Sequence, residues 1–315
     1  MGGTRKETAQ GTARTWRGRL LPRPTEDLED QGLGFDVETV LHRRSVLRGV
    51  GLGALGLGLV ACSSDAGDTA STTGPSGAGG EIPDETAGPY PGDGSNGPDV
   101  LEESGIIRSD IRSSIGDFTG TAEGVPMTLE LALSDLAAGG SAFAGVAVYV
   151  WHCDREGRYS LYSEGAEDQN YLRGAQVADA DGLVRFTSVF PACYAGRWPH
   201  IHFEVYPDRD SISDSTNAIA TSQVALPKAT CDQVYATTGY EQSAQNLTGV
   251  SLATDGVFAD DGAARQLASV TGNLDDGYTV KLAVRVDTAT QPKAGGAPPG
   301  ALNGAPLGGA PSQSG

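Results

Sequence analysis

Two histidines separated by a single residue, His200 and His202, are the residues in this 315-residue sequence whose spacing first suggests chemistry. They lie in the run PHIHFEVY (199–206), where alternating apolar and polar residues predict a β-strand. Side chains two positions apart on a strand point to the same face, and two imidazoles on one face can share a metal ion. The ordinary alternative is a pair of surface or hydrogen-bonded histidines.

Four stretches place this pair in a wider context: ETAGPYPGDG (85–94), VYVWHCDREGRYS (148–160), YLRGAQVADADGLVRFTSVFPACYAGRWPHIHF (171–203) and ATSQVALP (220–227). Together they resemble the intradiol ring-cleavage dioxygenases, the non-haem Fe(III) enzymes typified by protocatechuate and catechol dioxygenases. The resemblance extends over residues 85–290 and includes the spacing of Tyr159, Tyr194, Arg197, His200 and His202.

The resemblance implies that Tyr159, Tyr194, His200 and His202 hold a non-haem Fe(III) ion. The donor set suits that ion, because phenolate oxygen is a hard, anionic ligand that favours Fe(III) over Fe(II) or Zn(II). Two phenolates also leave one net positive charge on the ion, which a catecholate can balance.

Tyr162 follows Tyr159 by three residues and is the competing ligand candidate. The eight-residue spacing between Trp151 and Tyr159 matches the family and favours Tyr159. The ordinary alternative for Tyr159 is a tyrosine at a strand end with its hydroxyl in water. Tyr171 and Tyr206 are interpreted as packing residues.

The resemblance also implies the reaction: both atoms of O2 enter a catechol-type ring, and a cis,cis-muconate-type product forms. Substrate would displace Tyr194, which would take up a substrate proton as a general base. Arg197 would stabilise negative charge on the ring carbon, unless it merely forms a salt bridge at the rim. Gln223 would help to position the ring or O2. The residues expected to line the substrate pocket are Thr86, Gly88, Pro89, Tyr90 and Trp151.

The chain departs from the family between Tyr194 and His200, where only the five residues AGRWP intervene. The aromatic-acid and catechol enzymes have a longer loop there, which shapes their substrate cavity. A shorter loop predicts a more open iron site and a larger catechol as substrate, such as a lignin-derived or plant phenolic.

Two other functions compete with this one. The first is a metal-binding β-sandwich at the cell surface without catalysis, for which neither Arg197 nor Gln223 is needed. The second is a two-histidine extradiol or cupin-type oxygenase, which needs a carboxylate ligand. Glu204 is the carboxylate nearest to the histidine pair, and it is expected on the opposite face of the strand.

Three cysteines, Cys153, Cys193 and Cys231, remain after Cys62 is set aside, so at most one disulfide can form among them. Cys193 adjoins a proposed ligand, and a bond to either of the others would brace it. Three buried free thiols are an equally good interpretation.

The segments that contain most of these residues are predicted to be β-strands. Runs with alternating or β-branched residues occur at 125–133, 145–152, 182–190, 199–206, 220–226 and 278–287, with turn signals between them. One helix is expected at 228–237. The pattern predicts an all-β fold, a β-sandwich of mainly antiparallel strands with few short helices.

Both ends of the chain are expected to lie outside this fold. Residues 1–61 contain Arg43-Arg44, a short apolar run and Leu-Val-Ala before Cys62, typical of a twin-arginine signal with a lipoprotein acylation site at Cys62. Residues 62–81 resemble a flexible tether, 82–290 form the folded domain, and 291–315 form a Gly/Ala/Pro-rich tail expected to be disordered. The expected protein is exported, and a lipid anchor is its only membrane contact.

Composition narrows the possible functions. The formal charge of −18 argues against nucleic-acid binding, because phosphate would be repelled. The partners that the resemblance implies are a catechol-type substrate and O2, and the sequence leaves the oligomeric state open, a homo-oligomer included. Glycine contributes 45 residues, many of them in the signal, tether and tail, which explains a hydrophobic content of only 38%.

Overall fold

A computed structural model describes residues 15–16, 19–20 and 79–292 of the chain. The chain divides into two compact units, Met1–Thr72 and Thr73–Gly315. In the first unit, strands β1 (Thr15–Trp16) and β2 (Arg19–Leu20) form an antiparallel pair. The predicted signal motif and acylation site at Cys62 lie outside the described residues, as do most of the predicted tether and tail.

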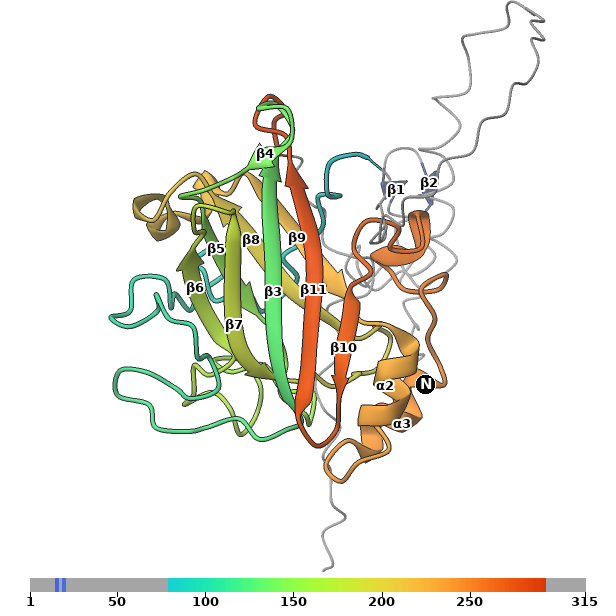
Figure 1. Ribbon diagram of the computed structural model, residues 1–315. Helices are drawn as coiled ribbons and strands as arrows, with labels where there is room; N and C mark the ends of the chain where they lie inside the picture. Colours follow the sequence, from blue (N-terminus) through green and yellow to red (C-terminus); the bar gives the residue numbers. More distant parts are fainter. Residues whose placement is uncertain (1–14, 17–18, 21–78, 293–315) are drawn as a thin grey trace, which may run out of the picture. The chain divides into compact units, whose positions relative to one another are not determined.

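The second unit contains two β-sheets (Figure 1). One sheet has the order β10–β11–β3–β4, with β7 also paired to β3, and its strands are β3 (Pro126–Asp135), β4 (Ser141–Ala142), β7 (Leu183–Val189), β10 (Ser269–Asn273) and β11 (Gly277–Val286). The other has the order β6–β5–β8–β9, with β5 (Ala147–Trp151), β6 (Arg173–Val177), β8 (His200–Tyr206) and β9 (Ala220–Ala225). Within these two sheets every pairing except the parallel β3–β11 ladder is antiparallel, which confirms the predicted fold class.

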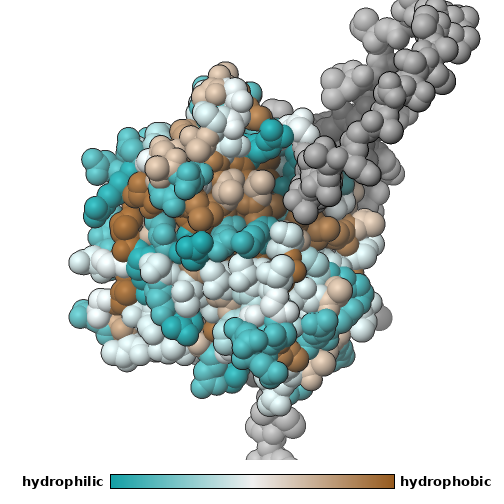
Figure 2. Space-filling view, in the orientation of Figure 1, coloured by the Kyte–Doolittle hydropathy of each residue, from teal (hydrophilic) through white to brown (hydrophobic). Residues whose placement is uncertain are grey.

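The main hydrophobic core draws on the facing sides of both sheets. Leu129 and Leu131 of β3 and Val280 of β11 are buried there, with Ile201 and Phe203 of β8. Burial alternates along β3 and β11 because one face of each strand meets the core and the other meets solvent. On the face of the molecule shown in Figure 2, hydrophilic and hydrophobic side chains are interspersed.

Strands β5 and β8 differ, because all their residues are buried. Their outer face carries a second hydrophobic cluster, in which Tyr149 and Trp151 pack with Val100, Leu101 and Ile106 of the segment before β3. A strand covered on both faces loses the polar-outward alternation of a half-exposed strand. Any polar side chain on this covered face therefore needs a specific partner.

The helical elements are short. The predicted helix is α2 (Lys228–Val234), and a second helix, α3 (Glu241–Leu247), follows it. Single 3-10 turns are η3 (Asp210–Ser213), η4 (Ser215–Asn217) and η5 (Phe258–Asp260). Within the described part of the chain, no helix combines the length and hydropathy needed to cross a bilayer.

Each of the six predicted strand runs overlaps a strand of the structure, namely β3, β5, β7, β8, β9 and β11. The sequence did not predict β4, β6 or β10. Strand β6 contains a buried arginine and a glycine, and β10 is a mostly exposed edge strand, so neither carries an alternating apolar pattern.

Candidate metal centre

His200 and His202 lie side by side on the covered outer face of β8, and both are buried. The strand register sets His202 directly opposite Trp151 of β5 and Gln223 of β9, and Trp151 opposite Arg173 of β6. Residues that pair across neighbouring strands share a face. One row across the four strands therefore contains four of the residues that build the site.

The His202 ring is fixed by its neighbours. The Trp151 ring stacks on it with centroids 4.9 Å apart and an angle of 7° between the planes. On the chain segment that covers the strand, a Cβ added to Gly88 would lie 3.3 Å from His202 Cε1. A glycine at that position therefore permits close approach to the imidazole.

The two imidazoles direct their Nε2 atoms toward one point. These atoms lie 3.1 Å apart, and Tyr194 Oη lies 3.1 Å from His200 Nε2. His200 Nδ1 lies 2.5 Å from the Trp198 carbonyl oxygen, which assigns the ring proton to Nδ1 and leaves the Nε2 lone pair facing the centre. Burial lowers the pKa of both histidines well below the usual value, so both rings are neutral at pH 7.

Tyr159 completes the cluster. Its ring centroid lies 5.9 Å from that of Tyr194 and 6.2 Å from that of His202. The hydroxyl is buried and has no hydrogen-bond partner among the described residues. A buried polar group without a partner is costly, and burial also raises the pKa of this phenol well above its usual value.

These features fit a hard cation. Two neutral imidazoles whose Nε2 atoms face each other, a nearby phenol and a phenol hydroxyl without a hydrogen-bond partner would all contact one positive ion placed between them. The described residues contain no group of three or more His, Cys, Asp or Glu side chains able to bind a metal.

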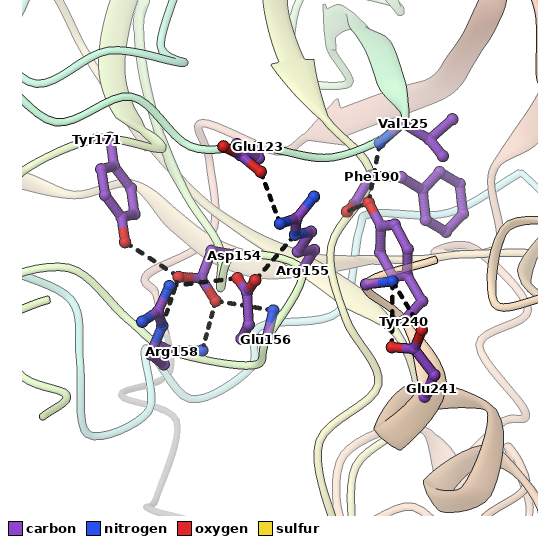
Figure 3. Close-up of polar contacts among 11 residues, drawn as sticks. Glu123, Val125, Asp154, Arg155, Glu156, Arg158, Tyr171, Phe190, Tyr240 and Glu241 are labelled. Atoms are coloured by element: carbon purple, nitrogen blue, oxygen red, sulfur yellow. Dashed lines mark hydrogen bonds and ion pairs between the residues drawn. The ribbon is translucent and has the colours of Figure 1, made fainter. Parts of the chain in front are cut away.

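The loop before Tyr159 is held by one buried carboxylate, Asp154 (Figure 3). Its Oδ1 accepts hydrogen bonds from the backbone N–H groups of Glu156 and Arg158. Its Oδ2 accepts from Arg158 Nε at 2.9 Å and from Tyr171 Oη at 3.0 Å. Asp154 thereby fixes the turn that precedes Tyr159, and no sequence pattern predicted this role. Tyr171, predicted to be a packing residue, also contributes a hydrogen bond.

Arg173, also absent from the predicted site, is buried behind the centre and uses all five of its N–H donors. Its Nε donates to Ser160 Oγ, Nη1 to the Pro91 carbonyl and Tyr149 Oη, and Nη2 to the carbonyls of Tyr90 and Ser160. One side chain therefore joins the loop of Tyr159 to the segment that contains Tyr90.

Arg197 and Gln223, both predicted to take part in catalysis, are in contact. Arg197 Nη2 donates to Gln223 Oε1 at 2.6 Å, and Gln223 Nε2 donates to the Thr86 carbonyl at 3.0 Å. Arg197 Nε also donates to Asp255 Oδ2 at 3.0 Å. Asp255 lies far from the motifs in sequence, and no local pattern pointed to it.

The predicted pocket segment lies against the centre in most positions. Thr86 contacts Gln223, Gly88 faces His202, and the Tyr90 ring lies 5.0 Å from the Tyr159 ring. The Pro89 carbonyl instead accepts a hydrogen bond from the exposed side chain of Asn96.

Tyr162, the competing ligand candidate, has two hydrogen-bond partners. Its hydroxyl accepts from the Gly92 N–H at 2.9 Å and donates to Asn96 Oδ1 at 2.7 Å. The hydroxyl is thus already engaged, whereas the Tyr159 hydroxyl is not.

The expectation that Glu204 lies on the strand face opposite His202 is wrong. The two residues are two positions apart in β8 and share the outer face, where Glu204 pairs with Tyr149. Its carboxyl group accepts a hydrogen bond from Tyr206 Oη at 2.7 Å, and burial raises its pKa to about 8. Glu204 and Tyr206 are therefore partners of each other, and Tyr206 is more than a packing residue.

Cys153, Cys193 and Cys231 are buried free thiols, so the interpretation without a disulfide holds for these three. Cys153 Sγ lies 3.8 Å from the Ala192 carbonyl oxygen, and Cys193 Sγ lies 3.5 Å from that of Arg197. Burial raises the pKa of Cys193 to about 12, which keeps this thiol protonated.

Comparisons with known proteins show similarities in sequence and in fold. Residues 96–206, about a third of the chain, match the profile of a protein family described as dioxygenase. A 55-residue segment is 38% identical to the chlorocatechol 1,2-dioxygenase of Rhodococcus opacus, and it covers 18% of this chain and 21% of that protein. The chain therefore aligns with about a fifth of the length of this curated relative.

Two solved structures share the fold. An intradiol ring-cleavage dioxygenase from Tetranychus urticae is 24% identical, with a TM-score of 0.52, over 67% of this chain and 97% of that one. The dioxygenase Tetur07g02040 is 23% identical, with a TM-score of 0.54, over 68% of this chain and 98% of that one. These two likenesses show the fold, and the profile match is confined to residues 96–206.

Proposed function

We propose that this chain is an intradiol ring-cleavage dioxygenase that uses Fe(III) bound by Tyr159, Tyr194, His200 and His202. The observation that carries the proposal is the meeting of the two imidazole Nε2 atoms with the Tyr194 hydroxyl, with the buried and partnerless Tyr159 hydroxyl close by and the Arg197–Gln223 pair alongside. Ferric iron, when bound, would supply the Lewis acidity that binds a catecholate and the covalency that makes its ring reactive toward O2.

The two tyrosines differ in a way that suits different roles. Tyr159 is 2% exposed and backed by the Asp154 turn, whereas Tyr194 is half-buried and adjoins the exposed residues Ala195 and Gly196. The less confined side chain is the better candidate to swing away from the centre. Tyr194 Oη would then take the proton that a catechol hydroxyl releases on binding.

Arg197 and Gln223 act on the ring and the incoming oxygen. A guanidinium beside the centre stabilises negative charge that develops on the ring carbon only during the reaction. The Gln223 amide, held by Arg197 and the Thr86 carbonyl, orients that group. Overall, the bond between the two hydroxyl-bearing carbons breaks, both atoms of O2 enter the product, and a cis,cis-muconate-type dicarboxylic acid results.

The substrate is expected to be a catechol with a bulky substituent. The short turn between Tyr194 and His200 leaves Ala195 and Gly196 exposed beside the centre, and a Cβ added to Gly196 would meet no atom within 4 Å. Nothing from this turn closes over a substituent that points outward.

The proposal is tested with purified protein loaded with Fe(III). We expect a tyrosinate-to-iron charge-transfer band in the visible, and O2 uptake with at least one member of a panel of catechols of increasing size. Mass spectrometry with 18O2 should find both labelled atoms in the product. Iron-replete protein that is colourless would refute the ligand set, and coloured protein without O2 uptake would leave a metal-binding protein without catalysis.

We further propose that the protein is exported by a twin-arginine signal and anchored by a lipid on Cys62. The support is the order of Arg43-Arg44, a short apolar run and Leu-Val-Ala-Cys in the sequence. Radiolabelled palmitate should enter the wild-type protein and not a Cys62→Ser variant. Replacement of both arginines by lysine should retain the protein in the cytoplasm, and unchanged export would contradict the signal assignment.

A further inference from the structure

Asp255 is a fully buried carboxylate with four hydrogen-bond donors around it. It lies between α3 and η5, and its Oδ1 accepts from the backbone N–H groups of Val257 at 2.8 Å and Phe258 at 3.0 Å. Its Oδ2 accepts from Arg197 Nε at 3.0 Å and from the Trp198 N–H at 2.6 Å. The two backbone contacts of Oδ1 fix the carboxylate, so the Oδ2 atom presented to Arg197 is itself immobile.

Arg197 needs such a support because of its place in the chain. It ends a turn whose two preceding residues, Ala195 and Gly196, are exposed, yet its own side chain is only 13% exposed. A long side chain on a short exposed turn has many rotamers open to it, and ordering it costs entropy. The contact with Asp255 at one edge and Gln223 Oε1 at the other selects a single orientation.

The opposite charges of Asp255 and Arg197 also hold the guanidinium in this orientation. The ion pair is inside the protein, where the attraction between guanidinium and carboxylate is less screened than at the surface. The Phe258 ring, whose backbone N–H also binds Asp255, lies 6.0 Å from the guanidinium carbon. The guanidinium therefore has three neighbours, which are Asp255, Phe258 and Gln223.

We infer that Asp255 is a positioning residue for Arg197, setting the guanidinium so that it faces the reacting ring carbon. The inference rests on the proposed function, and it assigns a role to a residue outside the motifs. The competing explanation is a structural role, in which Asp255 merely closes the turn at 255–258 and binds the Trp198 N–H.

A double-mutant cycle separates the two roles. In the iron-loaded full chain, Arg197→Gln should lower kcat/KM by about 100- to 1000-fold, as the loss of a charge-stabilising donor does. Asp255→Asn should lower it by about 10- to 100-fold through kcat rather than KM, because a displaced guanidinium is missed only in the transition state. The double variant should be no slower than Arg197→Gln alone within about threefold.

The iron site provides an independent readout. Asp255 contacts none of the four proposed ligands through its side chain, so Asp255→Asn should keep the wild-type iron content and visible band. Glu130→Gln is the matched control, since it removes a carboxylate that pairs with Arg185 and Lys281 on the other sheet. That control should leave kcat, KM and the band unchanged.

Equal losses from Asp255→Asn in the wild-type and Arg197→Gln backgrounds would overturn the inference in favour of a structural role. An unchanged kcat in Asp255→Asn would also overturn it. If Asp255→Asn does not fold, Asp255→Glu retains the charge and moves it by one methylene, and it should lower kcat at least tenfold with a normal band; an unchanged kcat again overturns the inference. Failure of the proposed function itself is distinguishable, because wild-type protein would then consume no O2, and the role of Asp255 would fall with it.

Discussion

At the scale of single residues, the centre is distinguished by which hydroxyls have partners. Tyr159 and Tyr162 are three residues apart and chemically identical, and both lie near Tyr90. Tyr162 is engaged with Gly92 and Asn96, while the Tyr159 hydroxyl is buried without a partner. A missing partner marks a position where a further group is needed, and the Tyr159 ring lies beside Tyr194 and His202.

The two tyrosines therefore respond in opposite directions to removal of the hydroxyl. In iron-free protein, Tyr159→Phe should raise the free energy of unfolding by about 1–2 kcal/mol, because it removes an unsatisfied buried group. Tyr162→Phe should lower it by about 1 kcal/mol, because two hydrogen bonds are lost. Urea unfolding of the two iron-free variants and the wild type measures these changes in the free energy of unfolding.

The iron-loaded forms provide the control for that comparison. Tyr159→Phe should weaken or shift the visible band, and Tyr162→Phe should not change it. A band that persists unaltered in Tyr159→Phe and disappears in Tyr162→Phe would exchange the two assignments.

Glu85, beside the buried Thr86, gives a pH dependence. Burial raises its pKa to about 7, and the negative charge of Asp260 contributes. A carboxyl group with a raised pKa in the folded state contributes stability that is present below pH 4.5 and is lost as the pH rises through 7.

Glu85→Gln should accordingly match the wild type in stability at pH 4 and exceed it at pH 8. We expect a gain of about 1 kcal/mol, because solvent reaches part of this side chain and screens its charge. Urea unfolding of iron-free protein at both pH values measures the gain, and the exposed Glu102→Gln serves as the control. Equal gains at both pH values would show that Glu85 is not the titrating group.

At the scale of elements, the strand register and the buried side chains of Asp154 and Arg173 assemble the centre. β8 places two of the proposed ligands, His200 and His202, on one face, and its pairing with β5 and β9 brings Trp151 and Gln223 into the same row as His202. The loops that deliver Tyr159 and Tyr90 are outside the sheet, and Arg173 of β6 joins them. A strand thus anchors the loops as well as the ligands.

Arg173→Lys tests this anchor. Lysine keeps the charge but has three donors in place of five, so some of the carbonyls of Tyr90, Pro91 and Ser160 lose their partners. We expect a loss of about 2–4 kcal/mol in unfolding free energy and a lower iron content after loading. Arg185→Lys, at an exposed ion pair on β7, should change stability by less than about 0.5 kcal/mol. Similar losses in both variants would argue against an anchoring role.

The same elements show what a sequence can and cannot predict here. The alternation in 199–206 predicted β8 and placed both histidines on one face, because strand geometry is local. Strand β6 was missed, since its arginine is buried by contacts with distant segments and resembles a surface residue in the sequence. Asp255 was missed for the same reason, because only the tertiary fold brings it to Arg197.

At the scale of the whole molecule, everything that builds the centre lies within the second compact unit. The hydrophobic clusters begin at Ile82 and end at Val286, close to the predicted domain limits of 82–290. A protein consisting of residues 79–292 should therefore fold, with a midpoint of thermal unfolding within a few degrees of the full chain, and should show the same visible band. Loss of the band in that shorter protein would mean that residues beyond these limits complete the site.

The parallel ladder between β3 and β11 has a consequence for the order in which the molecule forms. These strands pair over nine positions although they lie at opposite ends of the folded region in sequence. The strands of the other sheet, β5, β6, β8 and β9, all lie within 147–225 and emerge from the ribosome well before β11. During synthesis, the sheet that contains His200 and His202 can take shape first, while the facing sheet waits for its last strand. Until then the core lacks Val280 and Val284 of β11, so its apolar side chains stay partly uncovered and the nascent chain is prone to aggregation before its final strand is made.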